Sequence, residues 1–247
     1  MRKKTSYLTL VISVLMSTCH IASASPKCSL TTLKGTYIYG GTGMSDGAVR
    51  IEAGQDIFDG KGGIVNTHTD ETGLTTVTNG TYMMSPSCIG KSIYKGGISH
   101  TIYTSPSGSD ISQISSTEGT NMGWRQTRVS TSLKPKCSIN TLKGTYIFFQ
   151  VGNKNGNYYV ASGHEAYDGV GGIVNTVIDE KGGKVVTHAS YTMNQNCVGE
   201  SIYSDTGEKY TIYADPTGGG FRYGSATGSS ITISAGYVHR VSAHLIQ

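Results

Sequence analysis

Apolar and polar side chains alternate along the chain in short segments, and these segments predict strands rather than helices. Between residues 36 and 129, eight such segments are rich in β-branched and aromatic residues. The predicted strands are 36–39, 49–58, 64–69, 75–84, 89–94, 98–104, 111–115 and 122–129. Turn clusters rich in glycine separate them, and no segment after residue 24 keeps the 3.6-residue period of a helix. About eight strands in roughly 105 residues predict a small antiparallel up-and-down β-barrel, with a β-sandwich as the alternative.

The whole pattern occurs twice in the chain. KCSLTTLKGTYI at 27–38 returns as KCSINTLKGTYI at 136–147, and DGKGGIVNT at 59–67 returns as DGVGGIVNT at 168–176, both displaced by 109 residues. The segment 101–103 returns at 211–213, one residue later than this displacement predicts. So long a period is typical of a duplicated domain, not of a solenoid repeat. We expect the first barrel at 27–130 and the second at 136–247.

The repeated loop that begins at Asp59 is predicted to be a hairpin turn whose glycines adopt positive φ. A calcium loop would need several oxygen ligands at close spacing, and this loop has one carboxylate. A phosphate loop would need a following helix, whereas Ile64 and Val65 favour a strand.

Four cysteines follow residue 24, two in each repeat and 60 positions apart within each pair. This even count and spacing favour the disulfides Cys28–Cys88 and Cys137–Cys197 over the other two connectivities. Zinc is the alternative, but the sequence has no C-x-x-C motif and no histidine at ligand spacing beside a cysteine.

The first 24 residues have the features of a secretory signal peptide. Basic residues precede an apolar run, and Ala22-Ser23-Ala24 has the small-x-small pattern of a cleavage site. Lipidation at Cys19 is the less favoured alternative. We therefore expect a secreted or periplasmic protein without a membrane span. Residues 1–24 carry three of the basic charges and no acidic ones, so the net charge of +4 falls to about +1 after cleavage, which disfavours nucleic-acid binding.

The motifs resemble a family of small secreted bacterial domains that are calycin-like barrels related in shape to allene oxide cyclase. The matching elements are Cys28, LKGTY at 33–37, FDGKG at 58–62, GTY at 80–82 and Cys88 with Gly90. The second repeat matches as well, although Ala189-Ser190 replaces Gly80-Thr81. The resemblance implies the barrel fold and carries no catalytic residue across.

Catalytic motifs are weak in this sequence. Gly43-Met44-Ser45-Asp46-Gly47 fits G-x-S-x-G, but a glycine-rich loop between strands lacks the helix that a nucleophile elbow needs. None of the histidines after residue 24 has a histidine at the corresponding position of the other repeat, and no histidine, cysteine or carboxylate constellation is recognised in both copies. We therefore expect no metal, no cofactor and no catalytic residue.

Tyrosine gives the stronger functional indication, because the chain has 16 tyrosines against four phenylalanines and one tryptophan. Tyr with Ser and Gly is a composition that binding surfaces use. Alternation also places Asn66 and His68 on one face of a strand, where in a barrel interior they would need partners or a ligand. The binding candidates are Tyr37, Asn66, His68, Tyr94, Tyr103, Tyr146, Asn175, Tyr203 and Tyr213.

These features favour a secreted, non-catalytic module that binds a small apolar molecule, a glycan or a protein through tyrosine-rich surfaces or barrel cavities. The alternative is a cyclase or isomerase of the allene-oxide-cyclase type, in which a hollow barrel folds a reactive substrate. A cavity of several hundred Å³ would keep this alternative open.

Overall fold

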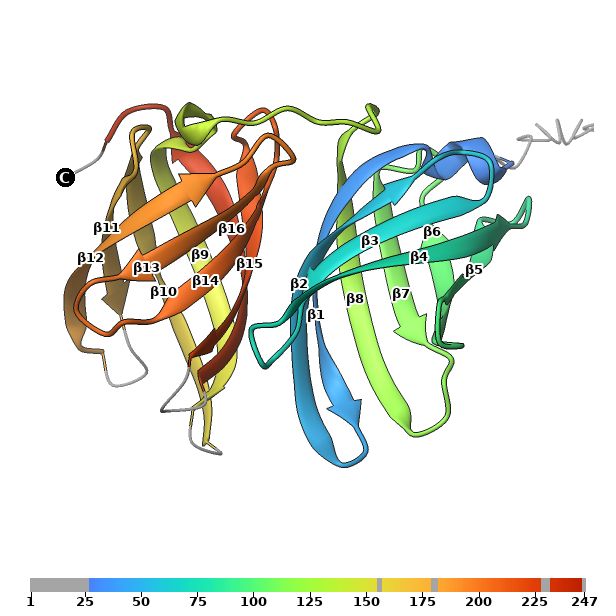
Figure 1. Ribbon diagram of the computed structural model, residues 1–247, viewed down its shortest axis with the longest axis horizontal. Coiled ribbons are helices and arrows are strands. Elements are labelled where there is room, and N and C mark those ends of the chain that lie inside the picture. Colours follow the sequence, from blue (N-terminus) through green and yellow to red (C-terminus); the bar gives the residue numbers. More distant parts are fainter. Residues whose placement is uncertain (1–26, 155–156, 179–181, 228–231, 246–247) are drawn as a thin grey trace, which may run out of the picture.

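The computed structural model of the chain describes residues 27–154, 157–178, 182–227 and 232–245. It consists of two antiparallel β-barrels that lie side by side and are joined by one linker (Figure 1). The expected barrel architecture is confirmed, and the sandwich alternative is wrong. The predicted signal peptide and Cys19 lie outside the described residues.

The first barrel has eight strands in sequential order, and β1 pairs with both β2 and β8 to close it. A 3-10 helix, η1 (Leu30–Leu33), precedes the strands. The strands are β1 (Gly35–Ser45), β2 (Ala48–Phe58), β3 (Gly63–Thr69), β4 (Thr75–Met84), β5 (Ile89–Tyr94), β6 (Ser99–Thr104), β7 (Asp110–Ser115) and β8 (Thr120–Ser130).

The second barrel repeats this order, with β9 pairing with both β10 and β16. Its 3-10 helix is η2 (Ile139–Thr141). The strands are β9 (Lys143–Lys154), β10 (Asn157–Asp168), β11 (Gly172–Ile178), β12 (Lys184–Met193), β13 (Val198–Tyr203), β14 (Lys209–Ala214), β15 (Gly220–Thr227) and β16 (Thr232–Ser242). Within the described residues, no helix is both long enough and apolar enough to cross a membrane.

The repeated cysteines and the repeated loops both stabilise the barrel fold. The disulfides Cys28–Cys88 and Cys137–Cys197 form as predicted, one in each barrel. The Asp59 side chain accepts hydrogen bonds from the backbone N–H of Lys61 and of Gly63, at 2.7 and 2.8 Å. The loop is therefore a turn that its own aspartate stabilises.

Strand β1 is longer than its sequence pattern indicates. The prediction ended at residue 39 because the glycine-rich segment that follows resembles a turn, yet the strand continues to Ser45. Gly41 is needed there, since a Cβ atom at this position would collide with the indole ring of Trp124 on the paired strand β8. Glycine at this position makes room for a side chain of the barrel interior.

Each barrel is packed solid near its 3-10 helix. In the first barrel, Leu33, Tyr37 and Phe58 are fully buried and belong to one apolar cluster. The Tyr37 hydroxyl donates to the carbonyl oxygen of Gly108, so this interior phenol is satisfied within the fold. Apolar packing thus closes one end of each barrel and confines any cavity to the other end.

The two barrels contact each other through β1 and β2 of the first and β14, β15 and β16 of the second. Tyr213 is fully buried there, and its hydroxyl lies 2.7 Å from the Thr69 hydroxyl of the first barrel. Ala53 is also fully buried and packs beside Gly224. Strand β2 is therefore covered on both faces, by its own barrel interior and by the second barrel. Separate folding of residues 27–130 and 136–247 stays a prediction.

Candidate functional site: two unlike barrel cavities

The first barrel encloses a cavity of about 410 Å³ at the end opposite η1. Small organic ligands occupy cavities of this size in proteins. Seven of the eight strands contribute the wall residues that matter below, and β4 contributes threonines near the mouth. The wall residues are Tyr39, Glu52, Asp56, Asn66, His68, Tyr94, His100, Gln113 and Trp124.

Asp56 is the centre of a hydrogen-bond network in this cavity. Its side chain is 1% exposed and accepts hydrogen bonds from Nδ2 of Asn66 at 2.8 Å and from Nε2 of Gln126 at 2.7 Å. The Tyr94 hydroxyl lies 3.5 Å from both carboxyl oxygens. Burial raises the pKa of Asp56 to about 6, although these three donors favour its ionised form. The network holds the carboxyl group in place with neutral partners only.

Glu52 lies on the same face of β2, because side chains alternate along a strand and the two acids are four residues apart. The indole Nε1 of Trp124 donates a hydrogen bond to its carboxyl group. Burial raises the pKa of Glu52 to about 7; the Trp124 bond opposes this effect, and the charges of Asp56 and Asp70 add to it. A carboxyl group with a pKa near neutrality can gain or lose a proton under physiological conditions.

Two histidines complete the polar wall. His100 is 8% exposed, and its ring lies against Trp124 with the ring centroids 4.3 Å apart. Burial lowers the pKa of His100 to about 4, and a side-chain hydrogen bond with Gln113 opposes this effect more weakly. The imidazole is therefore neutral at physiological pH. Nδ1 of His100 and Nε2 of Gln113 have no hydrogen-bond partner among the described residues. Nδ1 of His68, by contrast, lies 2.7 Å from Oδ1 of Asn66.

Glycines on neighbouring strands make room for the aromatic residues of the wall. A Cβ atom at Gly41 would collide with Trp124, and one at Gly54 would lie 2.7 Å from the Tyr39 hydroxyl. The second barrel has the same arrangement, with Gly163 beside Phe148 and Gly236 beside Tyr223. The position of each aromatic ring therefore depends on a glycine of the adjoining strand.

The second barrel encloses a cavity of about 340 Å³ in the corresponding place. Its buried carboxyl group, Glu165, accepts hydrogen bonds from the Tyr203 hydroxyl at 2.6 Å and from the Tyr167 hydroxyl at 3.0 Å. Burial raises the pKa of Glu165. The rings of Tyr203 and Tyr210 pack edge to face, with their centroids 5.4 Å apart. In the part of the chain that the structure describes, Oδ1 of Asn175 on this wall lacks a hydrogen-bond partner.

The two cavities share a small polar core and differ around it. The pairing of Gly41 with Trp124 and of Gln150 with Gly236 fixes the equivalent positions on the last strands. The shared pairs are Asp56 and Glu165, Asn66 and Asn175, and Tyr94 and Tyr203. The differing pairs are Tyr39 and Phe148, Glu52 and Ala161, His68 and Val177, His100 and Tyr210, and Trp124 and Gly236. A carboxylate with a tyrosine and an asparagine is thus present in both copies, which corrects the expectation that no such constellation is duplicated.

The tyrosines, asparagines and histidine predicted as binding residues fall into five places. Asn66, His68 and Tyr94 line the first cavity, and Asn175 and Tyr203 line the second. Tyr37 and Tyr146 are fully buried and donate to the carbonyl oxygens of Gly108 and Gly218. Tyr103 is 49% exposed on the outside of the first barrel, and Tyr213 lies between the barrels.

Sequence reasoning missed Glu52, Asp56 and Trp124 as wall residues. The alternation argument that paired Asn66 with His68 on β3 applies equally to the two acids on β2. Asp56 also has an acidic counterpart in the second repeat, Glu165, so the duplication pointed to it as well, whereas Glu52 and Trp124 occur in the first barrel alone.

Metal and nucleophile chemistry find little support in the geometry. Within the described residues, no group of three or more His, Cys, Asp or Glu side chains is placed to hold a metal ion. Ser45 of the G-x-S-x-G string ends β1 and leads through a turn into β2, without a helix. The chemistry available to the first cavity is proton exchange at Glu52, charge pairing and aromatic contact.

Comparisons with known proteins give no family. No family model and no curated protein matches the chain. Kievitone hydratase from Nectria haematococca is 7% identical with a TM-score of 0.29, covering 90% of this chain and 95% of that one. Intact Ap-TbpB (N and C lobes) is 8% identical with a TM-score of 0.32, and the match covers 89% of this chain and 79% of that one. CghA with Sch210972 is 8% identical with a TM-score of 0.26, and the match covers 84% of this chain and 89% of that one. Likeness at this level carries no argument about activity.

Proposed function

We propose that this chain is an exported protein that binds small molecules in its two barrel cavities, and that its barrels are tandem relatives of the calycin-like domains. The observation that carries the proposal is that each barrel is hollow at one end, with cavities of about 410 and 340 Å³. Aromatic walls with a few fixed polar groups are typical of ligand pockets. Buried polar atoms without a partner, such as Nδ1 of His100 and Oδ1 of Asn175, would gain one from a ligand.

Native mass spectrometry of the protein purified from its source tests this proposal. We expect a co-purified small molecule that is released on unfolding. The matched variants fill each cavity from its wall, with Thr78→Phe in the first barrel and Ala161→Phe in the second. Each should abolish binding in its own barrel only. A protein that carries no small molecule, and whose melting temperature no compound library raises, would overturn the proposal.

A second candidate function is acid–base conversion of a substrate in the first cavity, as in a cyclase or isomerase. The observation that favours it is Glu52, whose pKa burial raises to about 7, because general acids and bases work best with a pKa near the working pH. Under this alternative, Glu52→Gln removes turnover and leaves substrate affinity nearly unchanged. Under the binding proposal, truncating Tyr94 weakens affinity by about tenfold or more and no conversion is found.

A further inference from the structure

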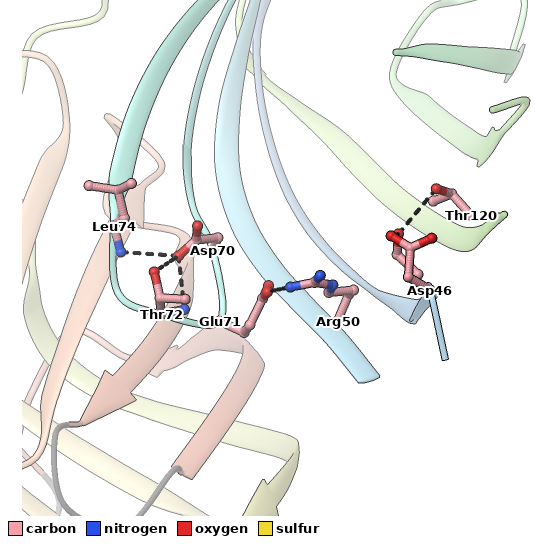
Figure 2. Close-up of polar contacts among 8 residues, drawn as sticks. Asp46, Arg50, Asp70, Glu71, Thr72, Leu74 and Thr120 are labelled. Carbon is pink, nitrogen blue, oxygen red and sulfur yellow. Dashed lines mark hydrogen bonds and ion pairs between the residues drawn. The ribbon is translucent and has the colours of Figure 1, made fainter. Parts of the chain in front are cut away.

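The first cavity contains acidic groups and no cation in its interior. Glu52 and Asp56 both point inward from β2. The two basic residues of the wall, Arg50 and Lys95, lie at the mouth; Lys95 is exposed and Arg50 is partly exposed. Figure 2 shows Arg50 reaching across to Glu71 on the β3–β4 turn, with which it forms an ion pair. The charge of Arg50 is therefore paired with Glu71 at the mouth of the cavity.

The turn that carries Glu71 is itself well held. Oδ1 of Asp70 accepts hydrogen bonds from the backbone N–H and the hydroxyl of Thr72, at 2.8 and 2.7 Å, and from the N–H of Leu74 at 3.1 Å (Figure 2). A turn fixed by its own aspartate keeps Glu71 in place as the partner of Arg50. The interior acids are consequently left without a positive partner from the protein.

Asp56 is buried and Glu52 is half-buried, and removing a carboxylate from water without a nearby cation is costly. Asp56 has three neutral donors around it. Glu52 has a single donor within the described residues, Nε1 of Trp124. A carboxylate in such surroundings gains most from a positively charged hydrogen-bond donor, which supplies both the charge and the missing bond.

Aromatic faces and unpartnered polar atoms surround the same place. Trp124, Tyr39 and Tyr94 line the cavity beside the acids, and aromatic faces attract cations, tryptophan most strongly. Neutral His100 offers an unpartnered Nδ1, which in one tautomer accepts a hydrogen bond from an ammonium group. The unpartnered Nε2 of Gln113 needs an acceptor, so the matching ligand also carries a hydroxyl or carbonyl oxygen.

We propose that the first cavity selects a small organic ammonium ion with an aromatic or apolar body, with Glu52 as its counter-ion and Trp124 against its body. This inference rests on the proposed binding function and makes it specific in one barrel. The ammonium group donates to Glu52 and to Nδ1 of His100, and an oxygen of the ligand accepts from Gln113. No covalent step is involved.

The second barrel serves as a control within the same chain. Ala161 and Gly236 stand where the first barrel has Glu52 and Trp124. Two acids remain on the wall of the second cavity. Glu165 already accepts hydrogen bonds from two phenols, and half-buried Glu208 accepts one from the Tyr210 hydroxyl at 3.0 Å. The second cavity therefore lacks the pairing of a carboxyl group with an indole ring at these positions and is expected to show a weaker preference for amines.

Trp124 is the only tryptophan of the chain, so its fluorescence reports on the first cavity alone. The probes are tyramine, whose phenolic hydroxyl can accept from Gln113, and 2-phenylethylamine, which lacks that oxygen. Each is paired with its neutral alcohol analogue, tyrosol and 2-phenylethanol. At about pH 8, where Glu52 is mostly ionised, each amine should bind about tenfold or more tightly than its alcohol. Glu52→Gln should remove this preference, and Glu165→Gln should leave it unchanged.

Calorimetry supplies a second readout through proton release. Binding of an ammonium ion stabilises ionised Glu52, so the protein releases a proton on binding at about pH 6–7, and affinity falls as the pH drops below about 7. Glu52→Gln should remove both effects. Heats measured in two buffers of different ionisation enthalpy give the number of protons released. The charged and titratable groups around Glu52 are Tyr39, Arg50, Asp56, His68, Asp70, Glu71, Tyr94, Lys95 and His100.

Several results would overturn the inference. In the first, the alcohols bind as tightly as the amines. In the second, the preference for amines persists in Glu52→Gln. In the third, the amines at millimolar concentration neither change Trp124 fluorescence nor give a heat of binding. In the first case small-molecule binding itself still stands. Failure of the binding function would be seen separately, as the absence of any co-purified molecule in native mass spectrometry.

Discussion

Replacing Glu52 by glutamine should make the protein more stable at neutral and alkaline pH. Glutamine keeps an oxygen that accepts from Nε1 of Trp124 and removes the charge that the fold buries. Because the pKa of Glu52 is raised in the folded state, that state binds the proton more tightly than the unfolded chain does. The native protein therefore loses stability as the pH rises from about 4.5 to about 7, and nothing further above it.

The size of this effect follows from the two pKa values. A rise from 4.5 to about 7, at about 1.4 kcal/mol for each pH unit, amounts to about 3 kcal/mol. The free energy of unfolding of the native protein, relative to Glu52→Gln, should thus fall by about 3 kcal/mol between about pH 4 and pH 8. Asp56 is present in both proteins, so its own titration largely cancels.

Urea unfolding followed by Trp124 fluorescence measures this difference, since the single tryptophan lies in the first barrel. Glu118→Gln is the matched control, because Glu118 is an exposed acid of the same barrel. Its stability should follow that of the native protein at every pH. If the free energies of unfolding of the native protein and of Glu52→Gln change with pH in the same way, the fold does not raise the pKa of Glu52.

Three further changes test other parts of the structure. Gly41→Ala should displace the Trp124 ring, lower the free energy of unfolding by about 1–3 kcal/mol and weaken ligand binding. Gly40→Ala is the control, because a Cβ atom there has nothing within 4 Å, and it should change neither unfolding nor Trp124 fluorescence. Equal effects of the two variants would count against the close approach of the ring. Tyr213→Phe removes one buried hydrogen bond between the barrels and should cost about 1 kcal/mol by calorimetry, so an unchanged transition would mean that this bond adds nothing. Replacing both cysteines of the first-barrel disulfide by alanine should cost on the order of 4 kcal/mol in urea unfolding, and a loss well below 1 kcal/mol would contradict the loop-closure argument.

Most of the fold could be predicted from local patterns. Strand ends fell within a few residues because turn glycines and β-branched runs are local signals, as at β3, predicted at 64–69 and observed from Gly63 to Thr69. The repeat then doubled the evidence for each strand and for each disulfide. The clear error, the early end of β1, arose because glycine marks turns and close packing alike, and only the ring of Trp124, far along the chain, distinguishes the two cases.

The cavity was less predictable, for physical reasons. Which tyrosines point into a hollow and which fill the closed end depends on where the 3-10 helix blocks the barrel. Tyr37 and Tyr94 look alike in the sequence, yet one donates to the carbonyl oxygen of Gly108 and the other faces Asp56. The acids of β2 could have been found from alternation alone, but their raised pKa values depend on burial by the whole barrel.

The contact between the barrels uses different surfaces on its two sides, so it is a head-to-tail joint. Joints of this kind can in principle continue indefinitely, adding one barrel after another. Here the duplicated positions have diverged: Ile178 stands at the position of Thr69, and Ile114 stands at the position of Gly224. Both isoleucines are exposed, at 45% and 46%, and neither can repeat the hydroxyl pairing or the close approach that joins the barrels. The duplicated positions therefore cannot form the contacts that join the two barrels, so this joint is specific to one order of unlike barrels.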